Sequence, residues 1–256
     1  MTRHIAIFNQ KGGSGKTTTT VNLAAALGRQ DRRVLVLDLD PQASASSWLG
    51  IKDGGRGLFD AFTDGLALRG LVQPTTAEGV DIIPSSSWLI GTDKALADKS
   101  DAETVLQRAL APLRESWQYI LIDCPPTLGI LATNALVSAR EVLVPVECHV
   151  MSLGGLARLI QVVSTIKEQL NPAIELTGIV ACRFDTRTRH AHEVVEELRR
   201  RFGPLVYETV IRENIRLAEC PSFSQPIISY DPFSYGAVDY RKLAQDVMRQ
   251  ESRLST

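Results

Sequence analysis

A glycine-rich segment with two lysines, close to the amino terminus, has the residue types and spacing of a phosphate-binding loop. The usual pattern, G-x-x-x-x-G-K-[ST], needs a glycine at position 10, where this chain has glutamine. The segment therefore fits only the variant K-G-G-x-G-K-[ST], whose glycine turns direct backbone N–H groups at phosphate oxygens and lead into a helix. We expect a nucleotide to contact the loop residues Lys11, Gly12, Gly13, Ser14, Gly15, Lys16, Thr17 and Thr18.

The charged and hydroxyl residues of this loop are expected to have separate roles. Lys16 stands at the predicted helix start and should contact the β- and γ-phosphates, while the Thr17 hydroxyl should ligate Mg²⁺. Lys11 lies on the far side of the glycine turn, so it need not contact the phosphates held by its own loop. Its position suits a nucleotide bound by a second subunit across a two-fold interface, where it would stabilise developing charge.

Three aspartates at the ends of predicted strands complete a hydrolytic site. Asp38 and Asp40 are two residues apart, so in an extended chain they project to the same side. Asp123 follows Ile120-Leu121-Ile122, a Walker B pattern in which the acid holds magnesium, usually through water. We expect Asp40 to orient the attacking water and Asp38 and Asp123 to support the metal together with Thr17. The predicted catalytic residues are Lys11, Lys16 and Asp40.

Apolar, strand-like segments alternate with helical ones along the chain. Strands are expected at residues 5–8, 33–38, 80–83, 119–123, 141–146 and 174–181. Helices are expected at residues 17–28, 101–114, 128–139, 152–170, 190–202 and 236–250. Residues 50–79 are glycine-rich and should form a surface excursion with a short helix. This alternation predicts an α/β fold over residues 1–256: a single-domain P-loop fold with a mostly parallel twisted sheet and helices on both faces.

The composition narrows the class of protein without identifying a partner. Lys and Arg together number 28 against 29 Asp and Glu, so nucleic-acid binding would require a local patch. The four cysteines are widely spaced and include no C-x-x-C pair, which argues against a structural zinc site. No stretch approaches the roughly 20 apolar residues of a membrane span. We therefore expect a cytoplasmic protein that makes no membrane contact.

Beyond these local patterns, nearly the whole chain resembles the ParA/Soj branch of deviant-Walker ATPases, which partition chromosomes, plasmids and other large cargo. The matching segments are residues 9–20, 34–42 (V-L-V-L-D-L-D-P-Q), 120–126 (I-L-I-D-C-P-P), 128–136, 184–188, 214–222 and 230–232. The resemblance implies that ATP and Mg²⁺ are bound in a sandwich homodimer, with Lys11 acting across it. It also implies slow, activator-stimulated ATP hydrolysis and a contact between Asn214 and the adenine.

Arginines are frequent between residues 183 and 216, but acidic residues nearly balance them. Eight arginines stand against six acidic residues, which by itself is typical of a solvated surface with internal ion pairs. The resemblance implies that Arg187 and Arg216 contact DNA without sequence preference. Because a two-fold dimer doubles such contacts, we expect nonspecific binding of double-stranded DNA that depends on ATP and falls steeply with salt. The protein should then associate with the nucleoid.

Three segments depart from the family pattern and leave the activator open. Residues 211–216, I-R-E-N-I-R, replace the usual I-P-R-N-V-R, and residues 147–155 replace a stretch that typically carries glutamine, aromatic residues and L-E-G. Residues 84–100 also differ from the usual pattern. The activator is therefore either a ParB-type protein or another cargo adaptor.

Several alternatives to chromosome or plasmid segregation stay open. They are ParA-like positioning of a carboxysome or chemoreceptor array, a MinD-like regulatory switch, and a small-molecule ligase or kinase of the same fold. The segment 247–256 lacks the continuous apolar face of a membrane-inserting helix, which argues against membrane recruitment. The chain also starts directly at a predicted strand, so we expect neither an N-terminal DNA-reading extension nor operator-based autorepression.

Overall fold

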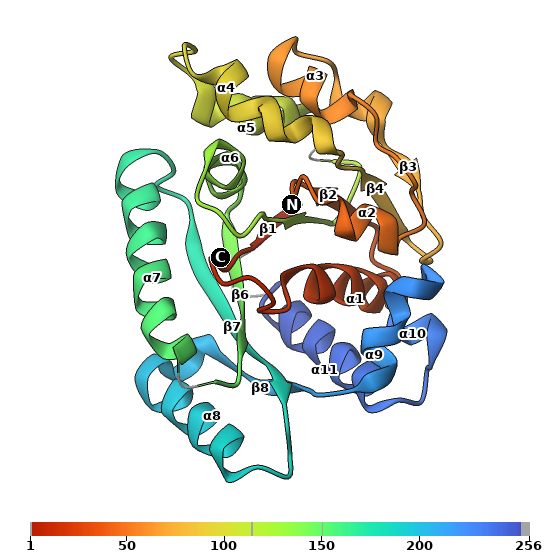
Figure 1. Cartoon of the computed structure of the whole chain (residues 1–256), viewed down its shortest axis with the longest axis vertical. Coiled ribbons are helices and arrows are strands. Elements are labelled where there is room, and N and C mark those ends of the chain that lie inside the picture. The colour runs from red at the N-terminus through yellow and green to blue at the C-terminus, as the bar shows by residue number, and fades with distance from the viewer. Residues whose placement is uncertain (1, 114, 150, 252–256) are drawn as a thin grey trace.

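The computed structural model of the chain describes residues 2–113, 115–149 and 151–251. One sheet of eight strands runs through it in the order β3-β4-β2-β5-β1-β6-β7-β8 (Figure 1). The strands are β1 (Arg3–Ile7), β2 (Val34–Asp38), β3 (Gln73–Pro74), β4 (Val80–Ile83), β5 (Tyr119–Asp123), β6 (Glu141–Glu147), β7 (Glu175–Phe184) and β8 (Val206–Arg212). Neighbouring strands are parallel except for β3 and β4. The predicted α/β fold with a mostly parallel sheet is confirmed.

Helices cover both faces of this sheet (Figure 1). They are α1 (Lys16–Gly28), α2 (Ser44–Trp48), α3 (Gly57–Thr63), α4 (Thr92–Leu96), α5 (Val105–Leu110), α6 (Ile130–Ser138), α7 (Met151–Gln169), α8 (Arg189–Phe202), α9 (Ile215–Glu219), α10 (Ile227–Tyr230) and α11 (Tyr235–Arg249). Helices α1 and α11 pack on one face, and α5 to α8 pack on the other.

The central strands are buried on both faces, which explains their continuous apolar sequences. In β1, Ile5 and Ile7 point into the core beneath α1 and α11, whereas Ala6 contributes to the core on the opposite face. This alternation follows from the two-residue period of a strand. Every residue of β1, β2 and β5 is buried, as expected for parallel strands covered by helices on both sides.

Several elements differ from the sequence prediction. The predicted helix 101–114 is largely replaced by the short α5 between two 3₁₀ turns, and Pro112 lies in the second turn, where an α-helix would need its missing N–H. Strand β8 was not predicted. It lies at the sheet edge, and its exposed Glu208 breaks the apolar run that marks a buried strand. In the segment 50–79, the predicted short helix is α3.

The carboxyl-terminal segment belongs partly to α11. Residues 247–249 end this helix, and residues 252–256 of the predicted non-membrane tail lie outside the described residues. None of the described helices combines the length and apolar character needed to cross a membrane.

Candidate nucleotide-binding site

The phosphate loop connects β1 to α1 at the carboxyl edge of the sheet. Gly13 and Gly15 have φ angles of 73° and 93°, in the left-handed region that favours glycine. Helix α1 begins at Lys16, so the N–H groups of its first turn lack helical partners and are available to an anion. The context of strand, glycine turn and helix that the motif requires is present.

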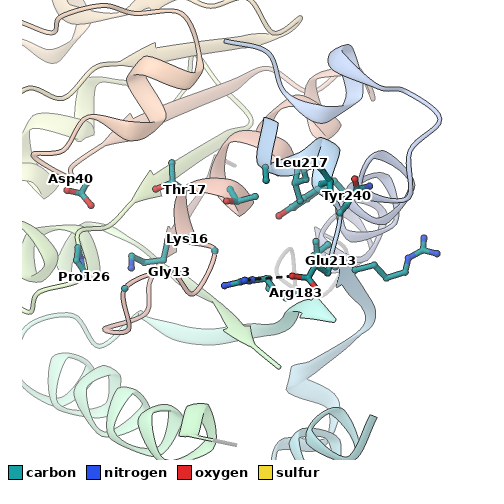
Figure 2. A pocket seen from close by; sticks show the side chains of 18 residues that line it. Gly13, Lys16, Thr17, Asp40, Pro126, Arg183, Glu213, Leu217 and Tyr240 are labelled. Atoms are coloured by element: carbon teal, nitrogen blue, oxygen red, sulfur yellow. Dashed lines mark ion pairs between the residues drawn. The ribbon is translucent and has the colours of Figure 1, made fainter. Parts of the chain in front are cut away.

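A cavity of about 540 Å³ opens beside this loop (Figure 2). It is lined by Gly12, Gly13, Gly15, Lys16, Thr17, Thr18, Asp40, Pro126, Cys182, Arg183, Ile211, Arg212, Glu213, Asn214, Ile215, Leu217, Ala218 and Tyr240. In Figure 2, Asp40 and Pro126 lie on one side of the loop, and Leu217 and Tyr240 lie on the other. The cavity thus has a carboxylate end and a largely apolar end, with the phosphate loop between them.

Lys16 and Ser14 are buried in different ways. The Lys16 Nζ donates a hydrogen bond of 3.3 Å to the Lys11 carbonyl, so the Lys16 side chain folds back toward the start of the loop. Burial lowers the pKa of Lys16, and the carboxylate of Asp123 opposes this shift. Ser14 does not line the cavity, and its buried Oγ has no hydrogen-bond partner among the described residues.

The predicted metal residues Thr17 and Asp123 are in direct contact. Thr17 Oγ1 donates to Asp123 Oδ2 at 2.8 Å, and Thr20 Oγ1 donates to Asp123 Oδ1 at 3.1 Å. Asp38 is the parallel-register neighbour of Asp123 on β2, and its own oxygens accept hydrogen bonds from Ser46 and from the Asp40 N–H. The structure therefore brings these two carboxylates together behind Thr17.

This pair of buried carboxylates fits a divalent cation. Burial raises the pKa of both acids, and the charge of Asp38 raises that of Asp123 further. Hard oxygen ligands near concentrated negative charge suit Mg²⁺, which keeps several waters and binds through one or two carboxylates. Among the described residues, no group of three or more His, Cys, Asp or Glu could hold a metal by itself. This donor set fits a cation that is shared with a nucleotide.

Asp40 lies at the carboxylate end of the cavity. It is half-buried, its Oδ1 accepts from the Gln42 N–H at 3.0 Å, and its backbone carbonyl accepts from Ser85 Oγ at 2.6 Å. These contacts fix the turn after β2 with the carboxylate in the cavity lining. The geometry is compatible with the predicted role of orienting water.

The opposite end of the cavity is formed by segments that are distant in sequence. Asn214 lines it and also caps α9, because its Oδ1 accepts the Arg216 N–H at 2.8 Å. Ile211, Leu217 and Tyr240 supply apolar surface there. Sequence reasoning missed Arg183 and Tyr240. The position of Arg183 near the carboxyl end of a parallel strand could have identified it, whereas no local pattern marks Tyr240.

Lys11 does not line the cavity. Its exposed side chain points to the end of β6, where Nζ contacts Glu147 Oε2 at 2.5 Å. Its N–H donates to Asn9 Oδ1 at 3.0 Å, and Asn9 in turn donates to the Pro145 carbonyl. The two lysines of the loop therefore have separate environments: Lys16 lines the cavity, and Lys11 lies outside it.

The predicted DNA-contacting arginines are exposed but already paired. Arg187 forms a forked ion pair with Asp185, with both N···O distances at 2.9 Å, and these hydrogen bonds lower the pKa of Asp185 to about 2. Arg216 contacts Glu219 at 3.0 Å. Arg187 follows β7, whereas Arg216 lies in α9. Both arginines that the resemblance assigns to DNA are thus paired with carboxylates of their own protomer.

Comparison with known proteins agrees with this geometry. The sequence pattern of a family described as an AAA domain matches residues 2–176. Together, the sheet topology, the glycine loop and the paired aspartates define a P-loop ATPase. A chromosome partitioning protein ParA of Myxococcus xanthus is 42% identical over 98% of this chain and 89% of its own length. A chromosome-partitioning ATPase Soj of Thermus thermophilus is 44% identical over 96% of this chain and 95% of its own length. The chain belongs to the ParA/Soj family.

Solved structures show the same fold. A Mycobacterium smegmatis cobyrinic acid a,c-diamide synthase with bound ADP and magnesium is 30% identical, with a TM-score of 0.85, and covers 98% of this chain and 95% of its own. The septum site-determining protein MinD of Pyrococcus horikoshii with Mg-ADP is 28% identical, with a TM-score of 0.79 and 96% of each chain covered. Cyanothece McdA in complex with ATP, at 20% identity, a TM-score of 0.85 and 96% of each chain, shows likeness of fold alone.

Proposed function

We propose that this protein is a Mg²⁺-dependent ATPase that forms an ATP-bound homodimer, binds double-stranded DNA without sequence preference, and positions or segregates a cargo. Hydrolysis is slow until a ParB-type protein or another cargo adaptor stimulates it. The observation that carries the proposal is the separation of the two loop lysines. Lys16 lines the cavity, whereas Lys11 lies outside it on the protein surface, where a second protomer can approach.

The relatives support a chromosome or plasmid as the cargo. Two proteins named for chromosome partitioning match this chain over at least 96% of its length at 42% identity or more. A DNA cargo and nonspecific DNA binding together imply a cytoplasmic protein associated with the nucleoid. The ligase alternative has weaker support, since the synthase of similar fold is only 30% identical.

The cavity residues divide the work of phosphoryl transfer to water. Lys16 and the α1 N-terminus hold the phosphates. Thr17 lines the cavity on the cation side, and the buried Asp123 and Asp38 lie behind it as the acids that support the cation. When bound, Mg²⁺ neutralises charge on the β- and γ-phosphates. Asp40 orients the attacking water from the same end of the cavity. Lys11 of one protomer contacts the nucleotide of the other.

The apolar end of the cavity suits the nucleoside. Leu217 and Tyr240 offer apolar contact area, and the Asn214 amide offers hydrogen bonds to the adenine. The Asn214 Oδ1 is already used by the α9 cap, so its Nδ2 is the group left for the base. An acceptor on the adenine ring fits this donor.

DNA binding would exchange internal carboxylates for phosphates. Arg187 would leave Asp185, and Arg216 would leave Glu219, as the backbone of the duplex approaches. Each exchange of a carboxylate for a phosphate contributes little binding free energy, so DNA binding needs the arginines of both protomers.

An electrophoretic mobility shift in low salt tests the proposal. Duplex DNA of unrelated sequences should be retained with ATP and Mg²⁺ and released when ATP is omitted. DNA retention that is absent, or equal with and without ATP, would refute it. Measurement of ATP turnover with and without DNA and the product of a neighbouring gene distinguishes the proposed function from a MinD-like switch. A turnover rate that does not depend on DNA favours the switch.

A further inference from the structure

Four charged side chains of alternating sign form a row that runs from outside the nucleotide cavity to Arg183 and Glu213 in its lining. Lys11 contacts Glu147 at 2.5 Å, Glu147 contacts Arg183 at 3.0 Å, and Arg183 lies 3.8 Å from Glu213. Figure 2 shows the Arg183–Glu213 pair at the cavity wall. The row starts in the phosphate loop and passes the ends of β6, β7 and β8. It therefore links Lys11 to the cavity lining through side-chain ion pairs.

Glu147 is shared between two cations. Its Oε2 accepts from Lys11 Nζ, and its Oε1 accepts from Arg183 Nη1. The hydrogen bond from Lys11 is the main reason that the pKa of Glu147 is lowered. In the parallel register, Glu147 is the partner of Cys182, so the sheet itself sets the carboxylate beside Arg183. The two cations thus share one carboxylate, each through a different oxygen.

The backbone of Arg183 is held in an unfavourable conformation. Its φ angle is 54°, and the pairing of β7 with β8 shifts register between Ala181 and Phe184. The left-handed region is energetically unfavourable for a non-glycine residue. Such irregularities re-aim a side chain, and here the side chain lines the cavity. This strain at a functional position is a second observation that assigns a role to the row.

We propose that Glu147 is a positioning residue that holds Lys11 within its own protomer, and that Arg183 weakens this hold by sharing the carboxylate. The inference rests on the proposed function, in which Lys11 must reach a partner's nucleotide. Because Lys11 has to leave Glu147 to do so, the Lys11–Glu147 pair opposes dimerisation. Two Lys11–Glu147 pairs are broken when a symmetric dimer forms, so the free-energy cost applies once in each protomer.

The test measures the dimer dissociation constant by analytical ultracentrifugation at saturating AMPPNP and Mg²⁺. Glu147→Gln keeps the shape and removes the charge, so this constant should fall about threefold to tenfold. Arg183→Gln should raise it, because Glu147 then no longer shares its carboxylate with Arg183. The double variant should behave like Glu147→Gln, because Arg183 acts through that carboxylate. The two single variants should thus change the dimer dissociation constant in opposite directions, and their effects should not add in the double variant. A merely structural role of these residues would not produce this combination.

Two controls keep the result interpretable. Glu78→Gln removes a carboxylate from an exposed ion pair with Arg29. Glu78 precedes β4, near the opposite edge of the sheet, so this variant should leave the dimer dissociation constant unchanged. Arg183 lines the cavity, so the nucleotide affinity of each monomeric variant is measured separately with a fluorescent ATP analogue. Thermal melting verifies folding, and Glu147→Ala serves as the second variant if Glu147→Gln does not fold.

The outcomes separate this inference from the proposed function. If the parent protein stays monomeric with AMPPNP, or Lys11→Ala dimerises normally, the proposed function fails and the inference with it. If the parent dimerises and Lys11→Ala does not, the proposed function stands. The inference is then overturned if Glu147→Gln leaves the dimer dissociation constant unchanged or raises it. It is also overturned if Arg183→Gln lowers this constant, as Glu147→Gln is expected to do.

Discussion

Thr17 Oγ1 donates a hydrogen bond of 2.8 Å to Asp123 Oδ2, which joins the first turn of α1 to the carboxyl end of β5. A hydroxyl and a buried carboxylate are thereby held side by side next to the phosphate loop. This contact connects the two motifs that the sequence places more than a hundred residues apart.

Asp123→Asn should weaken nucleotide binding only when magnesium is present. The amide preserves the size of the side chain but removes the charge that supports the cation, so affinity in Mg²⁺ should fall roughly tenfold or more. Titration of a fluorescent ATP analogue measures it, with EDTA as the metal-free arm. Parent and variant should bind alike in EDTA. Equal affinity of the two proteins in Mg²⁺ would exclude Asp123 from the metal site.

Asp40→Ala should stop hydrolysis and preserve binding. Loss of the water-orienting carboxylate should lower the turnover number by about 10²-fold or more, and the ATP dimer should persist on DNA. Phosphate release and DNA retention are measured on the same samples. Lys16→Ala is the contrasting variant, because it should abolish ATP binding. Turnover of Asp40→Ala at the parent rate would show that another group orients the water.

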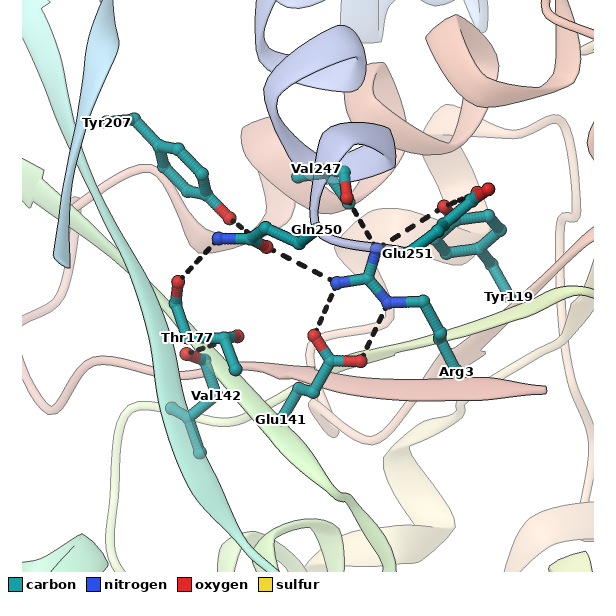
Figure 3. Close-up of polar contacts among 9 residues, drawn as sticks. All are labelled: Arg3, Tyr119, Glu141, Val142, Thr177, Tyr207, Val247, Gln250 and Glu251. Carbon is teal, nitrogen blue, oxygen red and sulfur yellow. Dashed lines mark hydrogen bonds and ion pairs between the residues drawn. The ribbon is translucent and has the colours of Figure 1, made fainter. Parts of the chain in front are cut away.

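A buried ion pair joins β1 to β6 and to the end of α11 (Figure 3). Arg3 Nε donates to Glu141 Oε1 at 2.8 Å, and Arg3 Nη1 donates to the Val247 carbonyl at 2.5 Å. Arg3 is 8% exposed and Glu141 is 3% exposed. The pair therefore lies in the low-dielectric interior, where an unpaired charge is costly.

Removal of one partner of this pair should destabilise the protein more than removal of both. Glu141→Leu leaves the Arg3 charge buried and should lower the free energy of unfolding by about 3 kcal/mol. Arg3→Met combined with Glu141→Leu should recover part of that loss. Urea denaturation followed by circular dichroism measures each value. A double variant that is less stable than Glu141→Leu would contradict this account.

Neutralising Arg187 should weaken DNA binding and its salt dependence together. A dimer that loses two phosphate contacts should show a slope of log K against log salt smaller by about 2. Asp185→Asn frees Arg187 from its forked pair and should strengthen binding. Arg189→Ala is the matched control, since this neighbour is also exposed and paired, with Glu193. Equal losses in Arg187→Ala and Arg189→Ala would indicate a diffuse charge effect instead of a specific contact.

Local patterns allowed the phosphate loop and its aspartates to be predicted. The loop is eight consecutive residues, and Asp123 follows the apolar run Ile120-Leu121-Ile122, so the sequence itself carries the signal. The contacts of Lys11 could not be predicted in this way, because Glu147 reaches Lys11 through the pairing of β1 with β6, and Arg183 reaches Glu147 through the pairing of β6 with β7. Strand β8 escaped prediction because an edge strand may include exposed polar residues without losing its place in the sheet.

The central claim is that Lys11 acts on the nucleotide of the partner protomer. It is tested most directly by complementation between Lys11→Ala and Asp40→Ala, mixed in equal amounts before ATP is added. Neither variant alone should hydrolyse ATP. In the mixed dimer, the nucleotide of the Lys11→Ala protomer meets its own Asp40 and the partner's Lys11, so one of two sites is complete.

The mixture should recover ATPase activity up to roughly one quarter of the parent rate, which is the value for random pairing, because the mixed dimer lacks one Lys11 and assembles less readily. If Lys11 instead acts on the nucleotide of its own loop, both sites of the mixed dimer lack an essential group. A mixture that stays as inactive as its two components, under conditions where the parent dimerises, would therefore contradict the account.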